Sequence, residues 1–292
     1  MTAISRRTVL LSAAAAGVAA AGPAAAQAER LARQLSGYAV NLDTWYRHVP
    51  FARRFALARA AGFRCVEFWP AIRPADTLDA AQIRRLLDEN GLSVSQYAPK
   101  VPNFSDPAAQ GELLTVIASA IADAKTLGCD KITVVGHALV PGMTREAMLA
   151  GYTAGLMRMA PLLEAGGVTA LVEPFNTVNH PGHLLNGSRP AVAMVKAVNS
   201  PRVKLLWDFY HMQLEEGDLI DKFTAAVAQV GYVQIGDVPG RHEPGTGEIN
   251  HAALIRAVRA AGYKDKIGLE FIPLADDGAA AVAAVAGLDA PL

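Results

Sequence analysis

From Tyr38 onward the chain alternates short apolar runs with amphipathic helical patterns, and the alternation repeats eight times. Short apolar runs separated by helices are typical of the strands of a parallel sheet. Eight repeats favour closure of that sheet into a (β/α)8 barrel over an open sheet. Because no linker or change of composition divides the pattern, we predict a single α/β domain with the (β/α)8 TIM barrel architecture.

The elements can be placed by residue. The predicted strands are Tyr38–Leu42, Cys65–Phe68, Val94–Tyr97, Lys131–Val135, Thr169–Glu173, Lys204–Asp208, Tyr232–Ile235 and Ile267–Glu270. The predicted helices are Phe51–Ala61, Asp79–Asn90, Pro107–Leu127, Thr144–Ala165, Pro190–Val198, Leu219–Val230, Ile249–Ala261 and a short, weakly packed last helix within Gly278–Leu288. Gly62 and Gly262 each follow a helix, where a left-handed cap needs a residue without a side chain.

The first 28 residues have the pattern of an export leader. Arg6 and Arg7 precede a run of Leu, Ala, Gly and Val that closes at Ala26-Gln27-Ala28, which is typical of a twin-arginine signal. The run is rich in alanine and interrupted by Gly22 and Pro23, so it is a poor membrane-spanning helix. We expect a leader over residues 1–28 that is cleaved after Ala28, no stable membrane anchor, a periplasmic protein, and a barrel domain over residues 29–292.

Charge and cysteine content exclude several classes of protein. The formal net charge of +0 argues against a nucleic-acid partner. Cys65 and Cys129 are too few for a disulfide framework or a cysteine-based zinc site. On separate strands of one sheet they would lie about 10 Å apart, beyond disulfide reach, so we expect both to pack in the core. The sequence leaves a homo-oligomer open.

Oxygen-bearing side chains end four late strands, at Glu173, Asp208, Gln234 and Glu270. The C-terminal ends of barrel strands meet at one mouth, so we expect these side chains to converge. Three carboxylates would repel one another there by several kcal/mol unless a cation or protons intervene. An all-oxygen set suits Mg²⁺ or Mn²⁺ better than zinc. The alternative is that each acid caps a helix or pairs with an arginine.

Several other residues have two interpretations. Gly245-Thr246-Gly247 precedes a helix expected near Glu248 and could cradle phosphate, although the motif is weak by itself. Glu67, at the end of the second strand, either supports the ligands from behind or forms a salt bridge to a helix. His137, just past the fourth strand, either contacts a metal or substrate or is a hydrogen-bonded structural histidine. His180 and His183 have the spacing of a metal pair, but Pro181-Gly182 breaks the helix that such a pair needs.

Long segments of the second half resemble a known family. They are VEPFN and NHPGHLLN within Val172–Asn186, WDFYHMQLEEGDL at Trp207–Leu219, VQIGDVPGRHEPGTGEIN from Val233, and GLEFIP at Gly268–Pro273. These segments are similar to those of hydroxypyruvate isomerase, a member of the xylose isomerase-like TIM barrels. The segment VPFARRFALARAAGFRCVEFW, at Val49–Trp69, also fits the first unit of that family.

The resemblance implies roles for six residues. Glu173, Asp208, Gln234 and Glu270 correspond to the metal ligands of the family, and Glu173 and Glu270 also to its acid and base. His211 and Arg241 fall where relatives contact substrate oxygens. A metal that holds adjacent carbonyl and hydroxyl oxygens acidifies the C–H bond between them and stabilises the enediolate formed when one glutamate removes the proton. The expected substrate is a small α-hydroxy carbonyl compound, either a keto acid or a keto-sugar.

Several activities remain open at this point. Return of the proton to the neighbouring carbon makes an isomerase, and return to the opposite face makes a ketose 3-epimerase. A dehydratase or lyase would expel a β-substituent from the same enediolate. The loop Pro99–Asp106 and the leader depart from the family pattern, so the substrate is open. A metal-dependent phosphodiesterase of this fold would need histidines around zinc and a basic face. A sugar-binding barrel without catalysis would not need a paired acid and base.

Overall fold

The computed structural model describes residues 22–69, 78–135 and 137–288. Within these residues, eight parallel strands pair in chain order and β8 pairs with β1, which closes the sheet into a barrel. The strands are β1 (Tyr38–Asn41), β2 (Cys65–Phe68), β3 (Ser93–Tyr97), β4 (Lys131–Val135), β5 (Thr169–Glu173), β6 (Val203–Asp208), β7 (Val230–Ile235) and β8 (Ile267–Leu269). The predicted (β/α)8 fold is confirmed.

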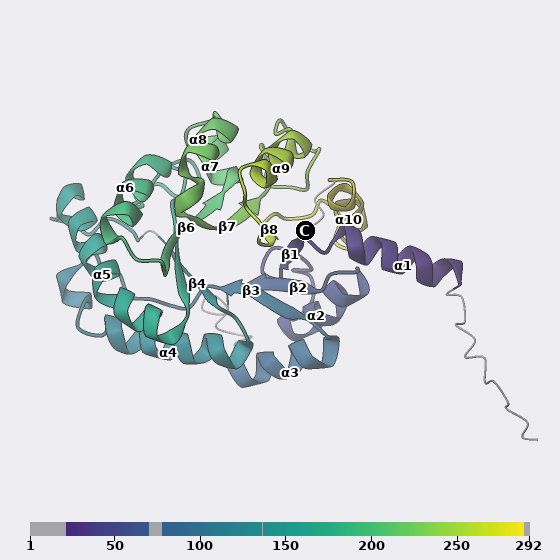
Figure 1. Ribbon diagram of the computed structural model, residues 1–292, viewed down its shortest axis with the longest axis horizontal. Helices are drawn as coiled ribbons and strands as arrows, with labels where there is room; N and C mark the ends of the chain where they lie inside the picture. Colours follow the sequence, from purple (N-terminus) through teal and green to yellow (C-terminus); the bar gives the residue numbers. More distant parts are fainter. Residues whose placement is uncertain (1–21, 70–77, 136, 289–292) are drawn as a thin grey trace, which may run out of the picture.

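Helices connect successive strands and surround the barrel (Figure 1). They are α2 (Phe51–Ala60), α3 (Ala80–Asn90), α4 (Leu113–Leu127), α5 (Arg145–Gly166), α6 (Ser188–Val198), α7 (Phe209–Glu215), α8 (Leu219–Ala226), α9 (His251–Ala260) and α10 (Ala279–Ala286). Two predictions were wrong in detail. A 3-10 turn at Pro107–Ala109 is separate from α4, and α9 begins at His251 because Asn250 caps it, its side chain accepting a hydrogen bond from the N–H of Ala253.

The expected glycine caps are present. Gly62 has φ +102° and Gly262 has φ +93°, a region that a residue with a Cβ enters only at a cost. Each follows a helix that ends at an alanine, and the chain then turns directly into the next strand. The short connections hold the helices tightly against the barrel.

Two layers of side chains fill the barrel on the side of β5, β6 and β7. Leu171, Leu206 and Tyr232 are buried in a cluster of their own, apart from the large core that lies between strands and helices. Side chains alternate between the two faces of a strand. Residues two positions further along these strands therefore also face the barrel interior, one layer nearer the C-terminal mouth. These residues are Glu173, Asp208 and Gln234.

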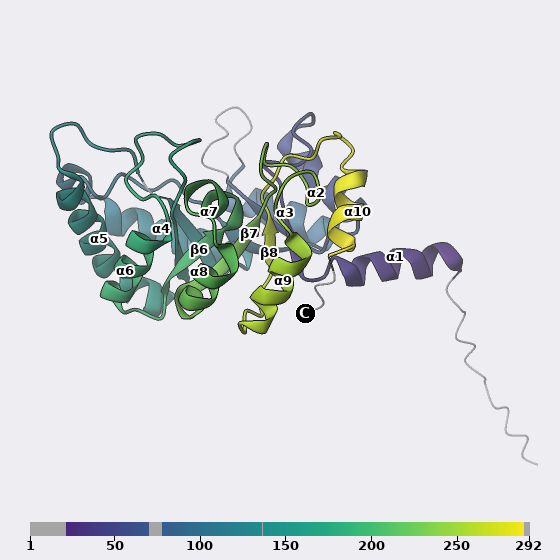
Figure 2. The same ribbon diagram turned by 90° about the horizontal axis from the view of Figure 1, so that it is seen from above.

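The N-terminal segment begins outside the barrel. Helix α1 (Pro23–Gln34) extends away from the barrel next to α10 (Figure 2), and the Gln34 side chain donates a hydrogen bond to the Ala286 carbonyl at 3.2 Å. Residues 1–21 of the predicted leader lie outside the described residues, so export stays a prediction. None of the helices in the described ranges is both long enough and apolar enough to cross a bilayer.

Two smaller expectations concern packing, and one helix was not expected. Cys65 and Cys129 are free and buried, as expected for core residues. The last helix, α10, has 8 residues and buries two of them, Ala281 and Val285, which agrees with the predicted short, weakly packed helix. Helix α7 was not predicted, because it starts directly after Asp208 without a connecting loop.

Candidate active site

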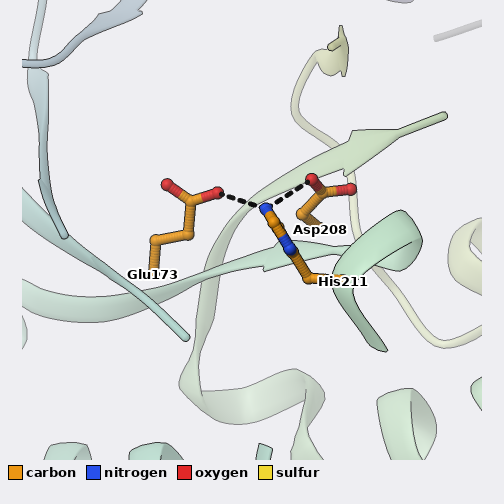
Figure 3. Close-up of side chains that lie close together, drawn as sticks. All are labelled: Glu173, Asp208 and His211. Carbon is orange, nitrogen blue, oxygen red and sulfur yellow. Dashed lines mark ion pairs between the residues drawn. The ribbon is translucent and has the colours of Figure 1, made fainter. Parts of the chain in front are cut away.

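Glu173, Asp208 and His211 come together at the C-terminal mouth of the barrel (Figure 3). Their ligand atoms lie within 4.8 Å of one another, and all three side chains are buried. The His211 ring nitrogen Nε2 lies 3.5 Å from Asp208 Oδ2 and 3.8 Å from Glu173 Oε1. Glu173 and Asp208 are the last residues of β5 and β6, and His211 lies in the first turn of α7.

The tautomer of His211 follows from its neighbours. Asn176 accepts a hydrogen bond from the backbone N–H of Asn179 at 2.8 Å, which fixes the position of its side-chain oxygen. Asn176 Nδ2 therefore donates to His211 Nδ1 at 2.6 Å. Burial, Arg241 and His180 lower the pKa of His211 well below its usual value, so the ring is neutral. A neutral ring that accepts at Nδ1 carries its proton on Nε2, which faces the two carboxylates and can donate to a substrate oxygen.

Arg241 links the remaining acid to this group. Its Nη2 atom donates to Asp208 Oδ2 at 2.6 Å and to Glu270 Oε1 at 2.5 Å, and its Nε donates to the Glu270 backbone carbonyl at 3.0 Å. The guanidinium also lies 4.8 Å from the centre of the Tyr210 ring. Arg241 has φ +57°, an unusual backbone conformation for this residue that turns its side chain back over the mouth.

Burial dominates the electrostatics of the three acids. It raises the pKa of Glu173 to about 8, with a further increase from Asp208, and it raises the pKa of Glu270 well above its usual value. Burial also raises the pKa of Asp208, against the opposing effect of Arg241. For Arg241 burial acts in the other direction, yet Glu270 and Asp208 raise the pKa of the guanidinium overall. One arginine therefore faces three buried carboxyl groups, and ionisation of all three would need a further positive charge, such as that of a divalent cation.

Gln234 lies beside this group but faces a different partner. It is opposite Asp208 in the register of β6 and β7 and is fully buried. Its Nε2 donates to Glu67 Oε1 at 2.8 Å, while its Oε1 has no hydrogen-bond partner in the part of the chain that the structure describes. Glu173 Oε1 is likewise buried and has no hydrogen-bond partner within the described ranges. Two unpartnered buried oxygens next to Asp208 and Glu270 fit a hard cation such as Mg²⁺ or Mn²⁺.

The structure therefore places all six predicted residues in one region, at the C-terminal mouth of the barrel. Glu173, Asp208 and His211 form a close cluster, Arg241 bridges Asp208 and Glu270, and Gln234 lies next to Asp208. The salt bridge between Glu67 and a helix, one of the two interpretations of that residue, is wrong because Glu67 hydrogen-bonds inside the barrel. The signal for its inward position was its place at the end of a strand, as for the other acids.

Sequence reasoning missed the role of Asp237. This fully buried carboxylate accepts four backbone hydrogen bonds, from Val238 and Ile249 at Oδ1 and from Gly245 and Gly247 at Oδ2, with distances of 2.9 to 3.1 Å. The N–H groups of the Gly245-Thr246-Gly247 turn are thus used by the protein itself. The phosphate-cradle interpretation of this turn is wrong. Asp237 folds the loop that carries Arg241, whose N–H donates to the Asp237 carbonyl at 3.0 Å.

A cavity of about 530 Å³ opens above the acids. It is lined by Trp69, Ala98, Pro99, Lys100, Val101, Thr133, Val135, His137, Glu173, Phe175, His180, His211, Arg241 and Glu270. His137 has no hydrogen-bond partner at Nε2 among the described residues, and burial together with His183 lowers its pKa to about 4. His180 stacks on Phe175 with ring centres 4.2 Å apart, so it forms part of the wall instead of a helical metal pair with His183.

Comparison with known proteins identifies the family of this chain. Residues 55–288 match the model of the xylose isomerase-like TIM barrel family. The chain belongs to this family. Among its relatives, a 2-oxo-tetronate isomerase of Cupriavidus necator is 34% identical over 83% of this chain and 95% of its own length. The hydroxypyruvate isomerase of Escherichia coli is 30% identical over 81% of this chain and 93% of its own length.

A solved structure of the same family agrees in fold. The structure named as an AP endonuclease of family 2 from Brucella melitensis superposes with a TM-score of 0.77 at 31% identity, covering 85% of this chain and 96% of that one. The resemblance to the family inferred from the sequence segments is thereby confirmed. The curated relatives are enzymes named as isomerases, which indicates that this family member is an enzyme of that class.

Proposed function

We propose that the protein is a metal-dependent isomerase that moves a proton between adjacent carbons of a small α-hydroxy keto acid, such as hydroxypyruvate or a 2-oxo-tetronate. The observation that carries the proposal is the pair of buried glutamates, Glu173 and Glu270, lining one cavity next to Asp208. Such a pair is what a proton shuttle needs, because one carboxyl group accepts a proton while the other donates one. The names of the curated relatives support the substrate class.

The residues that would hold the cation are Glu173, Asp208, Gln234 and Glu270. A divalent ion held there supplies Lewis-acid polarisation of the substrate carbonyl and hydroxyl oxygens, which lowers the pKa of the C–H bond between them. His211 is left out of this set, because its Nε2 carries the proton. We assign His211 instead to a hydrogen bond toward a substrate oxygen.

The reaction uses the chain's own acids and bases as follows. One glutamate takes the proton from the carbon that bears the hydroxyl group, and the C–H electron pair becomes the double bond of the enediolate. The proton of the original hydroxyl group passes to the former carbonyl oxygen, and the other glutamate gives a proton to the former carbonyl carbon, so the hydroxyl and the carbonyl exchange places. Arg241, held between Asp208 and Glu270, orients the oxygens of the substrate and stabilises their negative charge.

Solvent-label transfer tests the proposal. Purified protein with added Mn²⁺ is incubated with hydroxypyruvate or a 2-oxo-tetronate in D₂O, and we expect deuterium on the carbon that gains hydrogen in the product. Metal analysis of the same protein should find about one Mg²⁺ or Mn²⁺ per chain. Turnover that persists after chelation and dialysis, or product without deuterium under conditions where a control isomerase incorporates it, would contradict the proposal.

A ketose 3-epimerase is the second candidate. The cavity of about 530 Å³ is larger than a three-carbon acid needs, which favours testing keto-sugars beside keto acids. The same D₂O experiment separates the two, because an epimerase leaves the carbonyl in place and labels the carbon that is inverted. The phosphodiesterase alternative is less favoured: within the described residues, the group able to hold a metal contains only one histidine, His211.

We also propose that the protein is exported and that its leader is removed. The support is the paired arginines and the Ala26-Gln27-Ala28 site in the sequence. N-terminal sequencing of the mature protein is expected to begin near Glu29. A mature protein that retains Met1 would contradict export with cleavage.

A further inference from the structure

Glu67 is a fully buried carboxylate at the centre of a network of amide groups inside the barrel. Its Oε1 accepts hydrogen bonds from Gln234 Nε2 at 2.8 Å and from Asn41 Nδ2 at 3.1 Å. Its Oε2 accepts from Gln96 Nε2 at 3.2 Å. The three amides come from β1, β3 and β7, so the network crosses the barrel below its mouth.

One of the three amides, that of Asn41, is fixed independently of Glu67 by backbone donors. The oxygen of Asn41 accepts from the backbone N–H groups of Asp43 at 2.9 Å and Thr44 at 3.3 Å, so its Nδ2 must point the other way. The oxygen of Gln96 accepts from the Thr133 hydroxyl at 2.7 Å, and its Nε2 donates to Glu67. Glu67 is therefore an acceptor for Asn41, and its place in the network does not depend on Gln234.

Gln234 differs from the other two residues in the surroundings of its side-chain oxygen. Its nitrogen donates to Glu67, but among residues 22–69, 78–135 and 137–288 no donor reaches its buried oxygen. The oxygen and nitrogen of a glutamine amide have nearly the same size, so the partners of the amide decide which of the two faces a site. For Gln234, the partner that determines the orientation of the amide is Glu67.

The barrel makes room for this arrangement on β8. A Cβ at Gly268 would lie 2.5 Å from Glu67 Oε2 and 2.7 Å from Gln234 Cγ. Gly268 also pairs with Gln234 in the register of β7 and β8. Only glycine lets Glu67 and Gln234 approach each other across this strand, so the contact is built into the strand sequence.

We propose that Glu67 is a positioning residue for the metal site: it binds the amide nitrogen of Gln234 and thereby presents the amide oxygen to the cation held with Glu173, Asp208 and Glu270. This inference rests on the proposed function, because it takes Gln234 as a ligand. Without Glu67 the amide can rotate and offer its N–H₂ group, which repels a cation. Loss of a hydrogen-bond partner behind a ligand typically lowers metal affinity about 10- to 100-fold.

Calorimetric titration of the full-length, metal-free protein with Mn²⁺ tests the inference. Glu67→Met is expected to raise the Mn²⁺ dissociation constant about 10- to 100-fold. Glu67→Gln keeps one acceptor oxygen and should recover most of the affinity. Gln96→Met is the matched control, since it removes a buried donor from the other Glu67 oxygen and leaves Gln234 bound. It should lower the melting temperature of the metal-free protein while changing the Mn²⁺ affinity only a few-fold.

Gln234→Leu separates this inference from the proposed function. If wild-type protein binds Mn²⁺ and Gln234→Leu binds it equally well, Gln234 is not a ligand and the proposed metal set fails. If Gln234→Leu binds weakly but Glu67→Met binds like wild type, the set stands and the positioning role of Glu67 is wrong. Equal losses in Glu67→Met and Gln96→Met would also overturn the role, because they would reflect general loosening of the network.

A second measurement on the wild type does not depend on the folding of any Glu67 variant. The side-chain N–H₂ signals of Gln234, assigned by their absence in Gln234→Leu, are followed by NMR with and without Mg²⁺. We expect amide protons that exchange slowly in both states and a carbonyl carbon shift on Mg²⁺ addition. Rapid exchange of these protons in the Mg²⁺ form would contradict a hydrogen bond to Glu67.

Discussion

Replacing Glu270 by glutamine is expected to lower kcat by about 10² to 10⁴, the usual contribution of a general acid or base. Glutamine has the same shape and can still accept the hydrogen bond from Arg241 Nη2, so the fold and the position of the arginine should be kept. It cannot carry a proton to or from carbon. Steady-state kinetics at saturating Mn²⁺ measure the effect, and thermal melting checks the fold.

Two comparisons make this result specific. Saturating metal separates loss of the proton carrier from weakened metal binding, because Glu270 is proposed for both roles. Glu243→Gln is the matched control: Glu243 is equally buried and sits in the loop after β7, but it does not line the cavity and bonds to the backbone N–H of Leu274. The control should keep kcat near the wild-type value. Turnover of Glu270→Gln at the wild-type level would show that Glu270 moves no proton.

The barrel could be predicted from the sequence because its signals are periodic. Apolar strand runs separated by helical patterns leave few topologies, and two-residue alternation places Glu173 and Asp208 on the same face as Leu171 and Leu206 beneath them. Convergence of strand-end acids then follows from closure of the sheet. These inferences need no knowledge of any single side-chain contact.

The details that the sequence did not reveal depend on contacts between distant segments. Arg241, which contacts Asp208, lies in a long loop and has φ +57°, a conformation that no local pattern predicts. Glu67 had two interpretations, and the amides that surround it come from strands far apart in the chain. The orientation of the Gln234 side-chain amide depends in turn on its hydrogen bond to Glu67. The position of each of these residues along its strand could be predicted from the sequence, whereas the hydrogen-bond partner of each buried polar atom could not.

In the loop after β7, the backbone hydrogen bonds that Asp237 accepts could likewise not be predicted from the sequence. They lead to the prediction of a second large effect, on stability. Replacing Asp237 by alanine is expected to lower the free energy of unfolding by at least about 4 kcal/mol, since each buried N–H group left without an acceptor costs about 1–3 kcal/mol and this carboxylate serves four of them. The loop would loosen together with Arg241, so kcat should fall as well. Urea unfolding followed by circular dichroism measures the change.

Asp123→Ala, at an exposed position in α4, is the control and should change stability by no more than about 0.5 kcal/mol. Asp237→Asn keeps one acceptor oxygen and should fall between wild type and alanine. If Asp237→Ala unfolds like the control, the loop is held by its other contacts, and the position of Arg241 over the acids does not depend on this carboxylate.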